Sequence, residues 1–205
     1  MIHLANAIEA HQPARDRSVD IGVVKNHLLR VFTDTLATMN WVLEPRKSDL
    51  QFIFAGMSWR SKGFRLWTVE YNPVAKKFDA REASPNDGPI EKAAFVGDWA
   101  GRARAKLQRV SNTLTPQTSN AEFVVFEIVR DLIRDAQPHD SIGGVPQLIR
   151  IAEHMNTRIF AVRWPGPGGG VYLMGRKLFS YENTDNWILD AETLSIEKPR
   201  TYGHR

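Results

Sequence analysis

Cysteine is absent from this chain of 205 residues. This absence excludes disulfide bonds, thiolate zinc sites, iron–sulfur clusters and cysteine nucleophiles, because each requires cysteine. Long hydrophobic runs are absent as well, because no segment approaches the roughly 20 apolar residues that span a bilayer. The first twenty residues have neither a basic start nor an unbroken apolar stretch, unlike a secretory signal. We expect a cytoplasmic protein with no membrane segment.

The chain also lacks the low hydrophobicity and high charge of a disordered protein. It is 42% hydrophobic, 24% charged and 10% aromatic, which is ordinary for a globular protein. A domain of this length buries roughly 70% of the surface that its unfolded chain exposes. We therefore predict a single domain over residues 1–205, in which residues 1–19 form a partly ordered helix and a break.

Positive charge is only slightly in excess, since the formal net charge is +4. Acidic and basic residues are interspersed, which favours an ordinary solvated surface over a nucleic-acid-binding patch. Two groups of residues nevertheless carry cations of the kind that contact phosphates, and the first also has aromatic rings of the kind that stack on bases. One is a predicted hairpin with Trp59, Arg60, Lys62, Arg65 and Trp67, and the other is a helix flank with Arg102, Lys106 and Arg109.

Helical periodicity predicts the first strong element at residues 20–43. Asp20 is a suitable N-cap, and Pro45 ends the helix. Residues 2–10 resemble the end of a helix, and residues 12–18 form a polar break that contains proline. The apolar stripe of the helix consists of Val24, Leu28, Val31, Phe32, Met39 and Val42.

Three alternating segments follow and predict an antiparallel meander. They span residues 50–58, 63–71 and 77–83, and they are separated by turn-forming residues. Residues 93–98 predict a fourth short extended piece. The meander should therefore form one sheet early in the chain.

Two helices are predicted after these strands. The first begins near Trp99 and is amphipathic, and the second follows the capping pattern of Ser119 and Glu122. Apolar residues cover most of the circumference of the second helix, so we expect it to pack on two sides. The last third predicts strands at residues 158–164, 171–179 and around 186–197.

This order of elements indicates a fold class. Strands come in a run, then two helices, then strands again. Such an order predicts an α+β protein with antiparallel sheets and segregated helices, and argues against a doubly wound parallel sheet.

Neither a metal nor a cofactor is predicted. The glycine-rich loop at residues 165–170 lacks the lysine of a phosphate-binding loop and the strand-to-helix context of a dinucleotide fingerprint, so a flexible hairpin loop is expected. The histidines have no ligand spacing and are scattered along the chain at His3, His11, His27, His139, His154 and His204.

Two segments place glycine where an extended stretch turns into another element. Gly97 lies in the first, and Asp140, Gly143 and Gly144 lie in the second. In order and distance from the meander, these turns resemble those of proteasome β-subunits and the simpler bacterial proteasome-like proteases, members of the N-terminal-nucleophile hydrolase superfamily. The resemblance implies a layered α/β/β/α fold and packing of helices between subunits.

The chain departs from that family at two places. The family usually has a serine one step before the paired glycines, whereas Ile142 stands there. The family's catalytic threonine, serine or cysteine lies on an opening strand that has no counterpart before Asp20 in this sequence. We therefore predict no catalytic residue in this sequence.

Three hypotheses follow. The leading one is a proteasome-like protein that lacks the catalytic strand and acts as a structural or interacting subunit, in a homo-oligomer or with a protein partner. The second is a truncated peptidase or amidohydrolase whose start lies upstream, in which Asp140 would support the amino-terminal base. The third is a nucleic-acid-binding module that uses the hairpin and helix flank described above.

Overall fold

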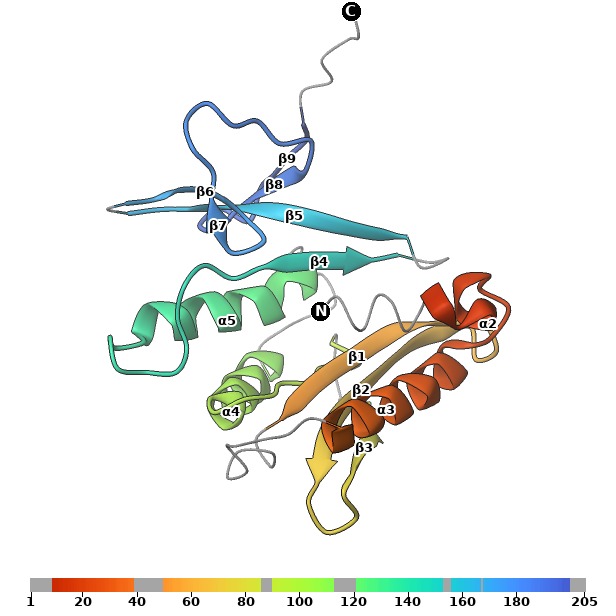
Figure 1. Cartoon of the computed structure of the whole chain (residues 1–205). Helices are drawn as coiled ribbons and strands as arrows, with labels where there is room; N and C mark the ends of the chain where they lie inside the picture. Colours follow the sequence, from red (N-terminus) through yellow and green to blue (C-terminus); the bar gives the residue numbers. More distant parts are fainter. Residues whose placement is uncertain are drawn as a thin grey trace, which may run out of the picture. The chain divides into compact units, whose positions relative to one another are not determined.

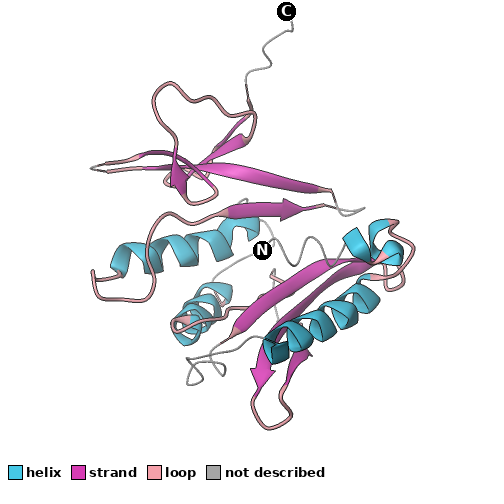
Figure 2. Cartoon of the chain, in the orientation of Figure 1, coloured by secondary structure: helices cyan, strands magenta, loops and turns pink. Residues whose placement is uncertain are grey.

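A computed structural model shows an α+β protein whose described residues form helices and two separate, mostly antiparallel sheets (Figures 1 and 2). This confirms the predicted class, without a doubly wound parallel sheet. The chain divides into two compact units, an N-terminal unit (Met1–Pro85 and Lys92–Gly97) and a C-terminal unit (Asn86–Glu91 and Asp98–Arg205). A single domain over residues 1–205 stays a prediction. The structure describes residues 9–38, 50–85, 90–112, 121–152, 156–166 and 168–199.

The N-terminal unit contains the short helix α2 (Gln12–Arg15) and the long helix α3 (Ile21–Thr38). Helix α2 occupies the first four residues of the break predicted at residues 12–18, so the break is shorter than predicted. The side chain of His11 accepts a hydrogen bond from the Ala14 N–H, which caps the first turn. Pro13 is tolerated there because the first turn of a helix needs no N–H from it.

Helix α3 confirms the described part of the predicted helix, and the remainder of the prediction, with Met39, Val42 and Pro45, lies outside the described residues. Asp20 caps it as expected, because its Oδ2 accepts a hydrogen bond from the Gly22 N–H at 3.3 Å. No helix within the described ranges is long and apolar enough to cross a membrane.

The first sheet is the predicted meander, with strand order β1-β2-β3 and antiparallel pairing throughout. Its strands are β1 (Gln51–Ser58), β2 (Gly63–Asn72) and β3 (Lys77–Glu82). The fourth extended piece predicted at residues 93–98 is not a strand, since residues 93–96 have no ladder partner and Gly97 is in a bend. Gly97 donates its N–H to the side chain of Gln51 instead.

Helix α3 lies along one face of this sheet and forms the core of the N-terminal unit with it (Figure 1). Leu36, Val69 and Phe78 are buried at the centre. The ring of Phe32 on α3 stacks on Phe52 of β1, with 5.1 Å between centroids. Burial of each such side chain contributes about 1.5–3 kcal/mol, so the apolar stripe of α3 largely determines where the helix docks.

The opposite face of β1 and β2 carries apolar side chains as well, beside the polar Thr68 and Glu70. Alternation along β1 places Ile53, Ala55 and Met57 on it, and the register sets Met57 beside Phe64 and Ala55 beside Leu66. This outer face is incompletely covered, because the side chains of Ile53 and Phe64 are 45% and 47% exposed.

The C-terminal unit opens with helix α4 (Ala100–Ser111), the 3₁₀ turn η2 (Ala121–Phe123) and helix α5 (Val124–Asp135). Helix α5 packs on two sides, as predicted. Phe126 enters the core of the second sheet, and Lys106 of α4 forms ion pairs with two aspartates of α5. Ser119, the first residue of the predicted capping pattern, lies outside the described residues.

The second sheet has the strand order β7-β6-β5-β8-β9, and β4 also pairs with β5. Strands β5 and β8 are parallel, whereas the other pairs are antiparallel. The strands are β4 (Leu148–Ile151), β5 (Thr157–Trp164), β6 (Gly170–Leu173), β7 (Arg176–Lys177), β8 (Trp187–Asp190) and β9 (Ile196–Glu197).

Two predicted strands each divide into a hairpin. Residues 171–179 turn at Met174 and Gly175, which both have positive φ. Two such residues in succession are typical of the tight turns that join antiparallel strands. Residues 186–197 divide likewise, and Asp190 accepts hydrogen bonds from two backbone N–H groups of the turn. Apolar periodicity alone does not reveal these turns.

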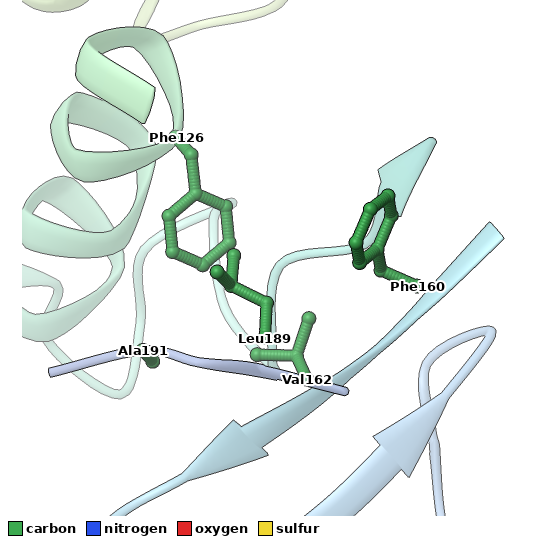
Figure 3. Packing of buried hydrophobic residues seen from close by; sticks show 5 residues of the cluster. All are labelled: Phe126, Phe160, Val162, Leu189 and Ala191. Carbon is green, nitrogen blue, oxygen red and sulfur yellow. The ribbon is translucent and has the colours of Figure 1, made fainter. Parts of the chain in front are cut away.

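The core of the C-terminal unit lies between α5 and the second sheet. Its buried members are Phe126 of α5 and four residues from or next to the central strands β5 and β8, as Figure 3 shows. Leu189 and Ala191 are 0% exposed. The core cluster consists of Phe126, Phe160, Val162, Leu189 and Ala191.

Candidate functional site

The loop after α5 lines an open cavity of about 520 Å³. The last turn of α5 forms one wall with Ile133 and Arg134, and Trp164 at the end of β5 forms another. The loop contributes Asp140 and the paired glycines that carried the family resemblance. We call this the Asp-Gly-Gly cavity, and its lining residues are Ile133, Arg134, Ala136, Gln137, Pro138, Asp140, Ser141, Ile142, Gly143, Gly144 and Trp164.

Asp140 closes a local turn at the rim of this cavity. Its Oδ2 accepts a hydrogen bond from the Gln137 N–H at 2.6 Å, and its own N–H donates to the Gln137 carbonyl at 3.0 Å. Such reciprocal bonding is the ordinary way in which aspartate stabilises a turn. The side chain is therefore held in place, with one carboxylate oxygen directed into local structure.

Arg134 holds the opposite wall. Its guanidinium lies over the Trp164 ring, 5.0 Å from the centroid, and both terminal nitrogens donate to the carboxylate of Glu192. A bidentate pair of this kind fixes the orientation of the guanidinium plane. The cavity thus presents an indole, a fixed cation and a fixed carboxylate, which suits binding.

The cavity offers no nucleophile–base pair among its described residues. Ser141 contributes a hydroxyl, and no hydrogen bond joins it to a histidine, lysine or carboxylate within the described part of the chain. Acyl transfer by serine needs such an adjacent base.

The two glycines of the cavity differ in conformation. Gly144 has φ of +80°, whereas Gly143 is outside the left-handed region. Gly97, in the N-terminal unit, has φ of +91°. The prediction that these turns require glycine is therefore confirmed for Gly97 and Gly144. The backbone conformation at Gly143 does not require glycine.

We expect Gly144→Ala to lower the free energy of unfolding by about 1–2 kcal/mol, because an alanine pays a steric cost at positive φ. The matched control is Gly143→Ala, where a Cβ meets nothing within 4 Å. That change should leave stability unchanged or raise it by about 0.5 kcal/mol. Urea unfolding of both variants measures the difference, and equal effects would contradict the assignment.

The residues proposed for nucleic-acid contacts are only partly available. Trp67 is 3% exposed, and Arg65 is paired with Glu82. The hydrogen bond from Arg65 lowers the pKa of the Glu82 carboxyl below its ordinary value. Trp59 is 57% exposed and has Arg60 over its ring, so the hairpin presents one aromatic platform where the sequence suggested two.

The helix flank on α4 is also partly neutralised. The Nζ of Lys106 lies 3.8 Å from Asp131 and 3.6 Å from Asp135. Arg102 stacks on Trp99 with 4.2 Å between the guanidinium carbon and the ring centroid, and Arg109 is exposed. The local net charge is therefore lower than the sequence pattern indicated.

Two of the histidines and the glycine-rich loop take structural positions. His11 and His27 stack with 4.2 Å between centroids. No group of three metal-ligating side chains occurs among the described residues, which exclude His3, His154 and His204. The loop at residues 165–170 joins the antiparallel strands β5 and β6 as the predicted hairpin.

Sequence reasoning missed a buried polar network in the N-terminal unit. The Ser58 Oγ donates to the Asp20 carboxylate, 2.9 and 3.1 Å from its two oxygens, and the Arg60 N–H donates to the same group at 3.3 Å. Asp20 and Ser58 are 5% and 1% exposed. The polar residue at the end of an apolar strand was the available signal, but only the capping role of Asp20 was recognised.

Comparison with known proteins adds no relative. No family model matches the sequence, and neither a curated protein nor a solved structure matches the chain. The class defined by the structure is therefore the α+β arrangement of two separate sheets and their helices.

Proposed function

We propose that this chain is a proteasome-like protein of the N-terminal-nucleophile hydrolase type that acts as a non-catalytic structural or interacting subunit in a homo-oligomer. The order of elements supports the proposal: helix, three-stranded meander, two helices and a second set of strands. The loop with Asp140 and the paired glycines follows the second of these helices, at the corresponding place in the family.

The observation that carries the proposal is the apolar outer face of the first sheet. Helix α3 covers one face, while Ile53 and Phe64 leave the other incompletely covered. A sheet with apolar side chains on both faces is stabilised by a layer on each side. A layered α/β/β/α fold supplies both layers, which is the arrangement that the family resemblance implies.

A structural role is favoured over hydrolysis by the Asp-Gly-Gly cavity. Its carboxylate and guanidinium are held by neighbouring groups, and its hydroxyl has no adjacent base within the described residues. Subunit contacts through helices would use α4, whose Arg102, Arg104 and Arg109 are exposed. Charged side chains at the rim of an interface affect the specificity and rate of association.

Sedimentation velocity of the purified chain at several concentrations tests the proposal. We expect an oligomer whose experimental structure has stacked sheets, and no cleavage of fluorogenic peptides. The double variant Arg102→Glu/Arg109→Glu should shift the protein toward smaller species, because like charges then replace the contacts of α4. The matched charge reversal Lys62→Glu/Lys76→Glu, in two hairpin turns, should leave the oligomer unchanged. A monomer with unstacked sheets, or peptide cleavage, would contradict the proposal.

A further inference from the structure

A second group of side chains surrounds Trp187, at the start of β8. The guanidinium carbon of Arg158 lies 3.9 Å from the centroid of the indole, and the Nζ of Lys198 lies 5.4 Å from it. The ring of Phe160 meets the indole edge to face at 6.3 Å, as part of the core of the C-terminal unit. The indole is thus a fixed platform that carries two cations.

Neither Arg158 nor Lys198 forms an ion pair with a carboxylate in the described part of the chain. The register of β4 and β5 also sets Arg150 directly opposite Arg158, and like charges at such positions are destabilising. Arg150 has a carboxylate of Glu122 at 3.7 Å, whereas Arg158 has none, so a bound anion would relieve the repulsion.

A cavity of about 300 Å³ opens beside the platform. Its walls are Thr157, Arg158, Ile159, Asp185, Asn186 and Trp187. Asn186 is fixed by a hydrogen bond from its Nδ2 to the Ile159 carbonyl at 2.9 Å and by the Thr184 hydroxyl. The exposed carboxylate of Asp185 has no partner within the described ranges, so it is free to accept hydrogen bonds from a ligand.

We propose that this cavity binds a small phosphate monoester of a polyol, such as a sugar phosphate. Stacking on the indole holds the guanidinium of Arg158 flat, with its N–H groups arranged for bidentate contact with phosphate. Arg158 lines the cavity, and Lys198 lies against the same indole without lining it. This excess of positive charge favours a phosphate monoester, which carries close to two negative charges at neutral pH, over a single carboxylate. Asp185 accepts hydrogen bonds from the ligand's hydroxyls, and the cavity volume is at the low end for ligand sites.

Isothermal titration of the full chain with ribose 5-phosphate tests the proposal, with ribose, inorganic phosphate and sulfate as comparison ligands. We expect saturable binding of ribose 5-phosphate. Arg158→Gln should weaken it roughly tenfold or more, and Lys198→Gln by a smaller factor, because Lys198 does not line the cavity. Arg60→Gln, which alters another arginine stacked on a tryptophan, is the matched control and should have no effect. Circular dichroism verifies that each variant is folded.

Asp185→Asn distinguishes recognition of the ligand's hydroxyls from recognition of its phosphate. The change should weaken the binding of ribose 5-phosphate, because the carboxylate accepts hydrogen bonds from its hydroxyls. The binding of inorganic phosphate should stay the same or become slightly tighter, because the carboxylate repels phosphate. A change in tryptophan fluorescence on binding, lost in Trp187→Phe, would support the location. Absence of saturable binding, sulfate binding of equal affinity, or binding insensitive to Arg158→Gln would overturn the proposal.

Discussion

Replacing Asp20 by alanine should lower the free energy of unfolding by about 2–4 kcal/mol. The change removes the cap of α3 and leaves the Ser58 hydroxyl and the Arg60 N–H without their acceptor. An unsatisfied buried donor costs about 1–3 kcal/mol, and loss of an aspartate cap costs about 1 kcal/mol. Equilibrium unfolding in urea measures the effect.

Asp34→Ala on the same helix is the control, because Asp34 is exposed. It should change stability by less than about 0.5 kcal/mol. The stability of Ser58→Ala should lie between those of the two variants, since the Asp20 carboxylate keeps its backbone donors. Similar stabilities for Asp20→Ala and Asp34→Ala would show that the buried network does not stabilise the N-terminal unit.

The same carboxylate makes stability depend on pH. Burial alone raises the pKa of Asp20, but the hydrogen bonds from Ser58, Gly22 and Arg60 outweigh it, so the pKa lies below its ordinary value of 3.8. A lowered folded-state pKa gives stability that is fully present above 3.8 and is lost as the pH falls through the folded-state value. Asp20→Asn should therefore reduce the slope of stability against pH in acid.

Elements with strong local periodicity could be predicted from the sequence. The stripe of α3 and the alternation of the meander depend on neighbours a few residues apart, and both were confirmed. The errors arose where one or two residues determine whether a segment is a strand, a turn or a helix. The turn at Met174 and Gly175 divides one apolar run, and a histidine side chain caps α2 within a predicted break.

The candidate sites depend on contacts that the sequence does not reveal. Asp20 and Ser58 are 38 positions apart and meet only because α3 docks at the end of β1. Arg158 reaches Trp187 because β5 and β8 pair in parallel, which a prediction of antiparallel sheets does not suggest. The Asp140 turn, by contrast, is local, and its place in the sequence was sufficient to identify it.

The packing of α5 on the second sheet gives the other large expected effect. Phe126→Ala should lower the free energy of unfolding by about 3–5 kcal/mol, because it removes a buried ring from the centre of the core and leaves a cavity. The ring contacts the cluster that contains Leu189 and Val162, as Figure 3 shows. Urea unfolding, monitored by circular dichroism, measures the loss.

Phe179→Ala is the matched control in the same unit. Its ring is 59% exposed, stacks on the exposed ring of Tyr181 and has the guanidinium carbon of Arg176 5.9 Å from its centroid. The same chemical change should therefore cost less than about 1 kcal/mol. Both variants remove a phenyl group from the unfolded chain. The difference between their free energies of unfolding therefore measures the contribution of burying the Phe126 ring. If Phe126→Ala were no more destabilising than Phe179→Ala, α5 would not be anchored by this ring, and the core of the C-terminal unit would have to be assigned elsewhere.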